Sequence, residues 1–400
     1  MSLLNYKPQF DNAYQEIFQK VLVAKKIANL RFESVLTYGE SVERVAYNID
    51  GVRVRTVTRG APSTIDSITD TSELLTINLE KEAAFYISDG EAKQAGPLNP
   101  GEVIGGQVAI KVAADFDARI FAEVLNAAQT FDTGDLTTLS SSGVPFAESS
   151  TNVPIMVAMM PSKLRRFNQT LSNLCFVTDS FGAGLMTQYL LGKNIDLAGS
   201  VYANGYTGDV SNAQLYVSEN LTGTAVLAMA TQPTDGDTVT INGVVFTFKT
   251  TLGVTAGQVL IGGSADAARA NLTALINAPG TTTAQGVALS AADQLTITDT
   301  LKLTATNDNT ANTMYILGIG SGAMVVSETF TDGTDAWTKN CIHAYFGKKG
   351  AIDAVLQDMK EVDMRPTSDR RGTNVFSSYL GGIKTFVDGS KKFLNVLLAR

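Results

Sequence analysis

The side chains best suited to nucleophilic or metal chemistry are few in this 400-residue chain. His343 is the single histidine and lies two residues after Cys341 in an apolar run, and the second cysteine is Cys175. A Ser-His-Asp or Cys-His site would have to use His343, whose apolar surroundings favour a structural role instead. A closed zinc site needs four ligands, so these three residues do not suffice. We expect both thiols to be buried and free, as in a reducing compartment.

Two other motifs could bind ions. Gly318-Ile-Gly-Ser-Gly322 resembles a glycine-rich phosphate loop, but it lacks the spacing and the following Lys-Ser/Thr pair of that motif. Asp235 and Asp237 could contribute to a calcium site at a strand edge, although solvated loop acids are the commoner case. We therefore expect no catalytic residues, no cofactor and no metal. A large apolar chain of this kind is expected to work by assembling.

Composition predicts a folded chain of two or three domains. Hydrophobic residues make up 44% of it and charged residues 18%, which is typical of proteins with large buried surfaces. Four hundred residues exceed what one core usually holds. No apolar run is long enough to span a bilayer, and the N-terminal sequence lacks the apolar stretch of a signal peptide, so we expect a cytoplasmic start and no membrane partner.

Residues 222–338 differ from the rest of the chain in composition. They are rich in Thr, Ala and Gly, and they carry three basic and nine acidic side chains, a net charge of −6 out of −8 for the whole chain. Such a break usually marks a separate domain. The flanking segments 214–221 and 339–346 are then expected to be adjacent strands of one interrupted domain.

The inserted segment predicts a small sheet-and-helix domain. Asn242-Gly243 between two alternating runs is typical of a β-hairpin turn. Ser264 is expected to cap a helix that ends near Ala278, with Pro279-Gly280 beyond it. Further strands are expected at 294–299, 301–306, 313–319 and 324–330.

The N-terminal residues are modestly basic. Residues 11–31 have apolar positions at near-helical spacing, which predicts a short amphipathic helix. Residues 1–31 carry a net charge of +3, to which Lys20, Lys25 and Lys26 contribute. These lysines could contact phosphates without sequence preference, or they could be an ordinary solvated helix face.

An arginine-bearing hairpin is expected next. Asp50-Gly51 is typical of a two-residue turn, and the alternation after it predicts strands on both sides. Arg53, Arg55 and Arg59 would line one stretch of this hairpin. It holds few apolar residues and is barely stable alone, so it either contacts another subunit or forms an edge hairpin with its arginines in water. Residues 73–88 are expected to form another long strand.

The most regular helical pattern follows Pro100-Gly101. Apolar side chains recur at i+4 steps, at Val108, Val112, Phe116, Ile120 and Val124. This spacing predicts a long helix over residues 101–129, with Asp115 and Arg119 on the opposite face. Asp115 and Asp117 lie near Arg119 and need no catalytic explanation.

The remaining segments are predicted as a loop at 130–150, a buried strand at Val153–Met160 and a helix that starts at Pro161-Ser162. A strand or loop should follow at 174–179. The tail at 379–398 is expected to be a strand, an Asp388-Gly389 turn and a second strand.

Several strings resemble those of phage coat proteins, namely residues 115–123, 216–220, 350–354 and 382–386. Residues 236–248 resemble a domain found in phage head and tail proteins. With the inserted segment set aside, the order of elements resembles the tailed-phage major capsid protein, the Hong Kong 97-type fold. The resemblance implies an α+β chain with an N-terminal arm, an extended loop, a spine helix and a β-rich apical domain that carries a small α+β insertion domain.

This resemblance implies the following domains: arm 1–38, extended loop 39–80, peripheral domain 81–150 with its spine helix at 101–129, apical domain 151–221 and 339–365, insertion domain 222–338, and C-terminal peripheral strands 366–400. It also implies a shell of hexamers and pentamers of this chain, assembled in the host bacterial cytoplasm. The further partners would be a separate scaffolding protein, a portal protein, packaged double-stranded DNA on the side of the basic arm and a decoration protein.

The chain departs from some relatives, which crosslink their shells through a lysine of the extended loop. No lysine occurs between Lys26 and Lys81, so we expect noncovalent stabilisation. Three alternatives remain open: an encapsulin-type compartment shell, a tail or adhesion protein, and an enzyme that uses His343. The inserted segment could stabilise the shell or bind sugars and host surfaces.

Overall fold

The computed structural model describes residues 23–32, 39–48, 52–60, 62, 65–90, 100–149, 151–167, 169–191, 209–210, 213–366 and 371–400. The chain divides into two compact units. The first comprises residues 1–20, 27–112 and 350–391, and the second comprises 21–26, 113–349 and 392–400. Helices and long strands occur in both, so the predicted α+β class is confirmed.

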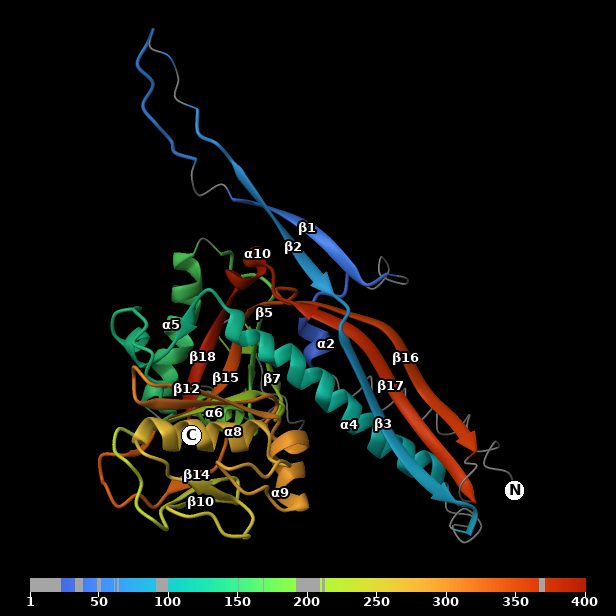
Figure 1. The fold of residues 1–400 in the computed structure, drawn as a ribbon. Helices are drawn as coiled ribbons and strands as arrows, with labels where there is room; N and C mark the ends of the chain where they lie inside the picture. Colours follow the sequence, from blue (N-terminus) through green and yellow to red (C-terminus); the bar gives the residue numbers. More distant parts are fainter. Residues whose placement is uncertain are drawn as a thin grey trace. The chain divides into compact units, whose positions relative to one another are not determined.

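The first unit contains a two-stranded ribbon of β1 (Ser41–Asn48) and β2 (Thr69–Thr76). These strands pair antiparallel from Ser41 opposite Thr76 to Asn48 opposite Thr69. The strand predicted directly after Gly51 is wrong, because β1 pairs with β2 instead. The turn itself was predicted at Asp50 and Gly51. Those two residues lie outside the described ones. Figure 1 shows the ribbon leading into a long connection.

Three long strands form the rest of the first unit: β3 (Leu79–Ser88), β16 (Asp353–Pro366) and β17 (Gly372–Lys384). They are antiparallel in the order β16-β17-β3 and run side by side in Figure 1. The single strand predicted at 73–88 is wrong, since the chain leaves β2 at Thr76 and enters a different sheet with β3. Leu75, Val355 and Phe386 form a small buried cluster in this unit.

Helix α4 (Pro100–Ala122) is continued by a 3₁₀ turn, η2 (Glu123–Asn126). The helix predicted over 101–129 is thus confirmed, with an end a few residues earlier. The change to 3₁₀ geometry in the last turn is common at helix ends. Two further short helices are α2 (Ala24–Ile27) and α10 (Val387–Ser390).

The second unit is built on a nine-stranded sheet with the order β12-β13-β8-β15-β5-β7-β6, in which β18 also pairs with β15 and β4 pairs with β18. Its members are β4 (Thr130–Phe131), β5 (Leu174–Thr178), β6 (Asp209–Val210), β7 (Ala213–Val217), β8 (Thr222–Ala228), β12 (Leu303–Asp308), β13 (Thr313–Gly318), β15 (Ala336–Lys348) and β18 (Phe393–Ala399). The prediction that 214–221 and 339–346 are adjacent strands is wrong, because β5 lies between β7 and β15.

Helix α5 (Asn152–Arg166) occupies the segment in which a buried strand was predicted at Val153–Met160. The predicted helix start at Pro161 is wrong as well, since Pro161 lies inside α5. The buried side chains Val153, Met156, Met160 and Leu164 recur every three or four residues, which is the spacing of one helix face. η3 (Thr133–Leu136) and α6 (Ser180–Leu191) complete this part of the unit.

The inserted segment adds a four-stranded sheet of β11 (Gln258–Leu260), β10 (Val244–Lys249), β9 (Thr238–Ile241) and β14 (Val326–Glu328), in that order. The hairpin at Asn242-Gly243 is confirmed: φ is 47° and 85° at these residues, as a type I′ turn requires. Helix α8 (Ala265–Asn277) is confirmed too, with Ser264 accepting a hydrogen bond from the Ala267 N–H.

One predicted strand of this segment is wrong. Residues 294–299 belong to α9 (Ala291–Leu295) and to a π-helical turn, η4 (Thr296–Thr300). The predicted strands at 301–306, 313–319 and 324–330 correspond to β12, β13 and β14. A continuous buried core joins both sheets and α8, and it includes Phe246, Leu272 and Met314.

The tail follows its prediction in outline. Strand β17 is followed by α10, which takes in the predicted Asp388-Gly389 turn, and then by β18. Strand β18 pairs with β15 over Cys341–Gly347, in the sheet of the second unit.

Candidate functional site

The most exposed apolar side chains of the first unit lie in the connection between β1 and β2. Val54 and Ile65 are almost fully exposed, at 105% and 91%, and Val57 is 74% exposed. Val52 and Ile68 are also exposed. A soluble monomer rarely presents such a series on one extended segment, so this segment is a candidate interaction surface.

Asp66 holds the two sides of this connection together. Its carboxylate accepts hydrogen bonds from the Arg53 backbone N–H at 2.9 Å and from both terminal nitrogens of Arg55 at 2.8 and 2.6 Å. These bonds, the Arg55 side chain first, keep the pKa of Asp66 below its usual value. Arg59 is exposed at the following turn. The structure thus brings Arg53 and Arg55 to one carboxylate, for which the sequence offered no signal.

The basic N-terminal lysines fall only partly within the described residues. Lys20 lies outside them, whereas Lys25 and Lys26 belong to α2, and Lys26 is exposed. Most of the helix predicted at 11–31 also lies outside the described residues.

Asp117 of α4 anchors the segment that contains α2. Its carboxylate accepts hydrogen bonds from the backbone N–H groups of Val23 and Ala24, at 3.0 and 3.1 Å. The side chain is fully buried, and burial is the main reason that its pKa rises to about 7. The two N–H donors and nearby Lys26 oppose this rise. The sequence held a signal for this position, since Asp117 lies four residues from both Ala113 and Phe121 on the apolar side of the helix.

The apolar positions predicted along this helix are largely buried. Val112 is 6% exposed, Phe116 is 1% exposed, and Ile120 and Val124 are fully buried. Val108 is half-buried. This burial agrees with a helix that is packed along its predicted face.

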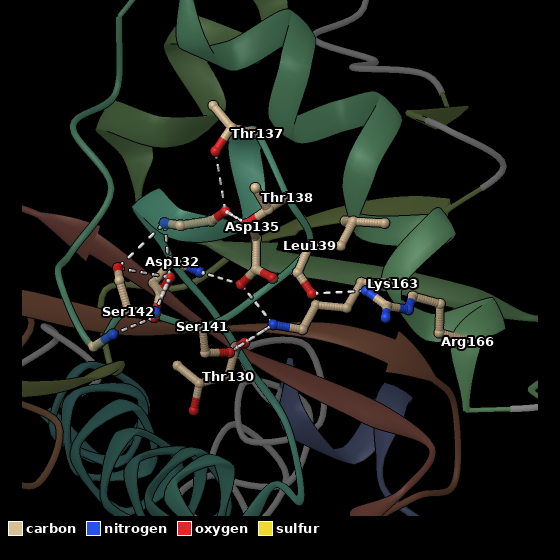
Figure 2. Close-up of polar contacts among 12 residues, drawn as sticks. Thr130, Asp132, Asp135, Thr137, Thr138, Leu139, Ser141, Ser142, Lys163 and Arg166 are labelled. Atoms are coloured by element: carbon tan, nitrogen blue, oxygen red, sulfur yellow. Dashed lines mark hydrogen bonds and ion pairs between the residues drawn. The ribbon is translucent and has the colours of Figure 1, made fainter.

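A polar cluster lies where η3 meets α5 (Figure 2). Lys163 donates to Asp135 Oδ2 at 2.5 Å and to Ser141 Oγ at 2.7 Å, and it also contacts the Thr130 carbonyl. Asp132 caps η3 by accepting from the Gly134 N–H at 3.0 Å. The Lys163 and Asp135 side chains are 3% and 0% exposed. The contacts of Lys163 tie residues 130–141 to α5, and those of Asp132 stay within the loop, so the cluster has a structural role.

His343 lies beside a cavity of about 310 Å³ in the second unit. Its Nε2 is 3.0 Å from Thr224 Oγ1 and its Nδ1 is 2.9 Å from Asn395 Oδ1. Burial lowers the pKa of His343 to about 4, which keeps the imidazole neutral, and the hydrogen bond to Asn395 opposes this shift. Burial also raises the pKa of the Cys341 thiol, 3.2 Å from the same threonine. A neutral thiol is a poor nucleophile.

Both cysteines are free and buried, as predicted. Within the described ranges no group of three or more His, Cys, Asp or Glu side chains could hold a metal ion. Asp235 pairs with Lys249 at 3.0 Å. Asp237 accepts from the Thr234 N–H at 2.7 Å and from Thr331 Oγ1 at 3.0 Å, so both acids have protein partners. No helix in the described part of the chain is long and apolar enough to cross a membrane.

No protein-family model matches this chain, and no curated protein matches its sequence. Solved structures match it along most of its length. A structure from Mycobacterium phage Che8 is 14% identical and covers 93% of this chain and 90% of its own, with a TM-score of 0.49. The capsid of cyanophage P-SCSP1u is 9% identical over 91% of this chain and 84% of its own, with a TM-score of 0.45.

A virus-like particle from Pyrococcus furiosus is also similar, at 9% identity over 98% of this chain and 99% of its own, with a TM-score of 0.43. Phage capsids are thus prominent among the structures that match this chain.

Proposed function

We propose that this chain is the major capsid protein of a tailed phage and that many copies of it assemble into the shell around the genome. The observation that carries the proposal is the series of exposed apolar side chains, Val54, Val57 and Ile65 foremost, in the connection between β1 and β2. In addition, the chain has the order of elements that the sequence resemblance implies, from the ribbon through a long helix to an interrupted sheet.

The energetics of this connection favour assembly. Burying one Val or Ile side chain contributes about 1.5–3 kcal/mol, so a few such contacts per copy give each subunit interface a substantial gain. A two-stranded ribbon is marginally stable by itself and gains most from lying on a neighbour. Closed shells need such contacts repeated between identical chains.

The partners follow from the same proposal. The chain would form hexamers and pentamers with itself, assisted by a separate scaffolding protein and a portal protein. Lys20, Lys25 and Lys26 would face the packaged double-stranded DNA and bind it without sequence preference. The acidic inserted segment would face outward, where a decoration protein could bind. The chain would be assembled in the host cytoplasm, reside in the virion capsid and have no enzymatic activity.

The test is assembly of the purified chain, with and without its scaffolding partner, by negative-stain electron microscopy. We expect closed shells from the unaltered chain and none from the double variant V54E/I65E, because two buried charges would oppose the subunit contact. The variant V254E is the matched control, since Val254 is 97% exposed in the inserted segment. It should form shells normally.

Circular dichroism of V54E/I65E should show a folded chain, which separates failed assembly from failed folding. Shells formed by V54E/I65E would show that the connection between β1 and β2 is not needed for assembly. Only monomers or fibres from the unaltered chain under both conditions would overturn the capsid proposal in favour of a tail or adhesion protein. Shells that enclose cargo protein instead of DNA in the native host would favour the compartment alternative.

A further inference from the structure

The inserted segment contacts helix α4 through an ion pair. The Lys302 ammonium binds Asp115 Oδ1, and Asp115 Oδ2 accepts a hydrogen bond from Arg119 Nε at 2.9 Å. The Lys302 and Asp115 side chains are 25% and 18% exposed, so solvent only partly screens the pair. Residues separated by 187 positions in the chain are thereby joined.

A second contact with the same part of α4 depends on a glycine. Gly320 follows β13 and adopts a left-handed backbone, with φ at 72°. A Cβ at this position would lie 2.5 Å from the Cβ of Ala118, which is a clash. Ala118 is itself only 2% exposed. The turn after β13 therefore lies so close to α4 that only glycine fits at position 320 without a clash.

Lys302 also has a left-handed backbone, with φ at 48°. This conformation is unfavourable for a residue other than glycine, asparagine or aspartate and persists only where surrounding contacts impose it. Lys302 stands immediately before β12, which is fixed by its pairing with β13. The sheet and the ion pair together hold this conformation.

The inserted segment is also continuous with the sheet that carries the interrupted domain. Strand β8 lies between β13 and β15. Its Ala225 and Leu227 belong to the core of the inserted segment, whereas Thr224, immediately before Ala225, contacts His343 of β15. The Gly322 N–H donates to the Leu221 carbonyl at 2.8 Å, which ties the turn that contains Gly320 to the start of β8.

We propose that the inserted segment is a brace for the C-terminal half of α4, in which Lys302 and Gly320 hold Asp115 and Ala118. The brace acts within one chain, so it is distinct from contacts between neighbouring copies and from binding of an outside surface. It does not depend on the proposed capsid function, because it can be measured whether or not shells form.

The experiment is hydrogen–deuterium exchange of the full-length chain, read for peptides that cover residues 113–122. The variant K302N removes the ammonium while asparagine still tolerates the left-handed backbone. Its matched control is K249N, because Lys249 forms an exposed ion pair with Asp235 inside the inserted segment. The variant G320A adds the clashing methyl group. Its control is G236A, since Gly236 has φ at 99° with open space around its Cβ position.

We expect K302N to raise the exchange rates of residues 113–122 about threefold, the effect of losing one partly exposed ion pair. G320A should raise them further, about tenfold, because strain and clash add. K249N and G236A should leave them unchanged. Unchanged exchange at 113–122 in K302N, or an equal rise in K302N and K249N, would overturn the brace. If G320A does not fold, the K302N and K249N pair still decides between these outcomes.

Discussion

The ion pair of Lys163 and Asp135 is the clearest case of a single contact on which local stability depends. Both side chains are buried, and the ammonium is surrounded by hydrogen-bond acceptors (Figure 2). Removing one member of such a pair leaves an uncompensated buried charge, which typically costs about 3–5 kcal/mol. We therefore expect K163M to lower the free energy of unfolding by about this amount, measured by denaturant titration.

The double variant K163M/D135N tests whether the unpaired Asp135 carboxylate causes the loss of stability in K163M. An asparagine at 135 is uncharged and can still accept the Asp132 N–H, which now donates to Asp135 Oδ2 at 3.0 Å. We expect the double variant to recover part of the stability that K163M loses. A double variant less stable than K163M would show that lost packing, not an unpaired carboxylate, causes the effect.

Asp117 predicts a specific dependence of stability on pH. Its pKa in the folded chain, about 7, is above the ordinary value of 3.8 because the carboxyl is buried. The folded state therefore binds its proton more tightly than the unfolded state does. The stability that this group contributes is complete below about pH 4 and is lost as pH rises to about 7.

The variant D117N lacks this titration and isolates its effect. Relative to D117N, the unaltered chain should lose about 1–3 kcal/mol of unfolding free energy between pH 5 and pH 8, from 1.36 kcal/mol per unit of pKa shift. Denaturant titrations of both chains at several pH values provide the measurement. Parallel stability curves for the two chains would contradict a raised pKa at Asp117.

At the scale of elements, turns and caps were predictable because their causes are local. Asn242-Gly243 forms the expected hairpin since both residues tolerate positive φ, and Ser264 caps α8 through its own side chain. The sequence pattern of α4 was also sufficient to predict a helix, because five apolar residues at i+4 spacing fit a helix and not a strand.

Short apolar runs were less informative. Val153–Met160 fits a buried strand as well as a helix, and the proline after it favoured a helix start at that point; the structure instead continues one helix through Pro161. Residues 294–299 alternate like a strand, yet they form a helical turn in which Ile297 is the buried side chain. Length and tertiary packing decide such cases, and neither is visible in a window of six or eight residues.

Contacts between distant segments were not predictable from one sequence. Strand β1 pairs with β2, some twenty residues further along the chain, and not with the residues that follow the predicted turn. Asp66 and Lys302 are likewise recognisable as important only in the folded chain, where Arg55 and Asp115 are their partners. Asp117 did carry a local signal that the prediction left unused, because an acid on the apolar side of a helix is itself a sign of a buried contact.

At the scale of the whole chain, the segment 222–338 has a buried core of its own but shares a sheet with the residues that flank it. Strand β8 begins at Thr222 and supplies β15 with a neighbour from Ala336 to His343. The second unit includes the whole inserted segment. A segment that differs in composition can therefore be essential to the sheet beside it.

This arrangement predicts the result of two excisions. Joining Leu221 to Lys339 removes β8, so backbone groups of β15 lose their partners and Cys341 and His343 lose Thr224. Joining Met229 to Asp335 by a short glycine linker keeps β8 paired with β15, since Ala228 lies opposite Ala336. Unpaired buried backbone groups cost about 1–3 kcal/mol each, so the first excision should give mainly insoluble protein and the second a larger soluble fraction. Soluble yield and size-exclusion chromatography measure the difference. A soluble, folded product from the first excision would show that β8 is dispensable and that the inserted segment is an accessory domain after all.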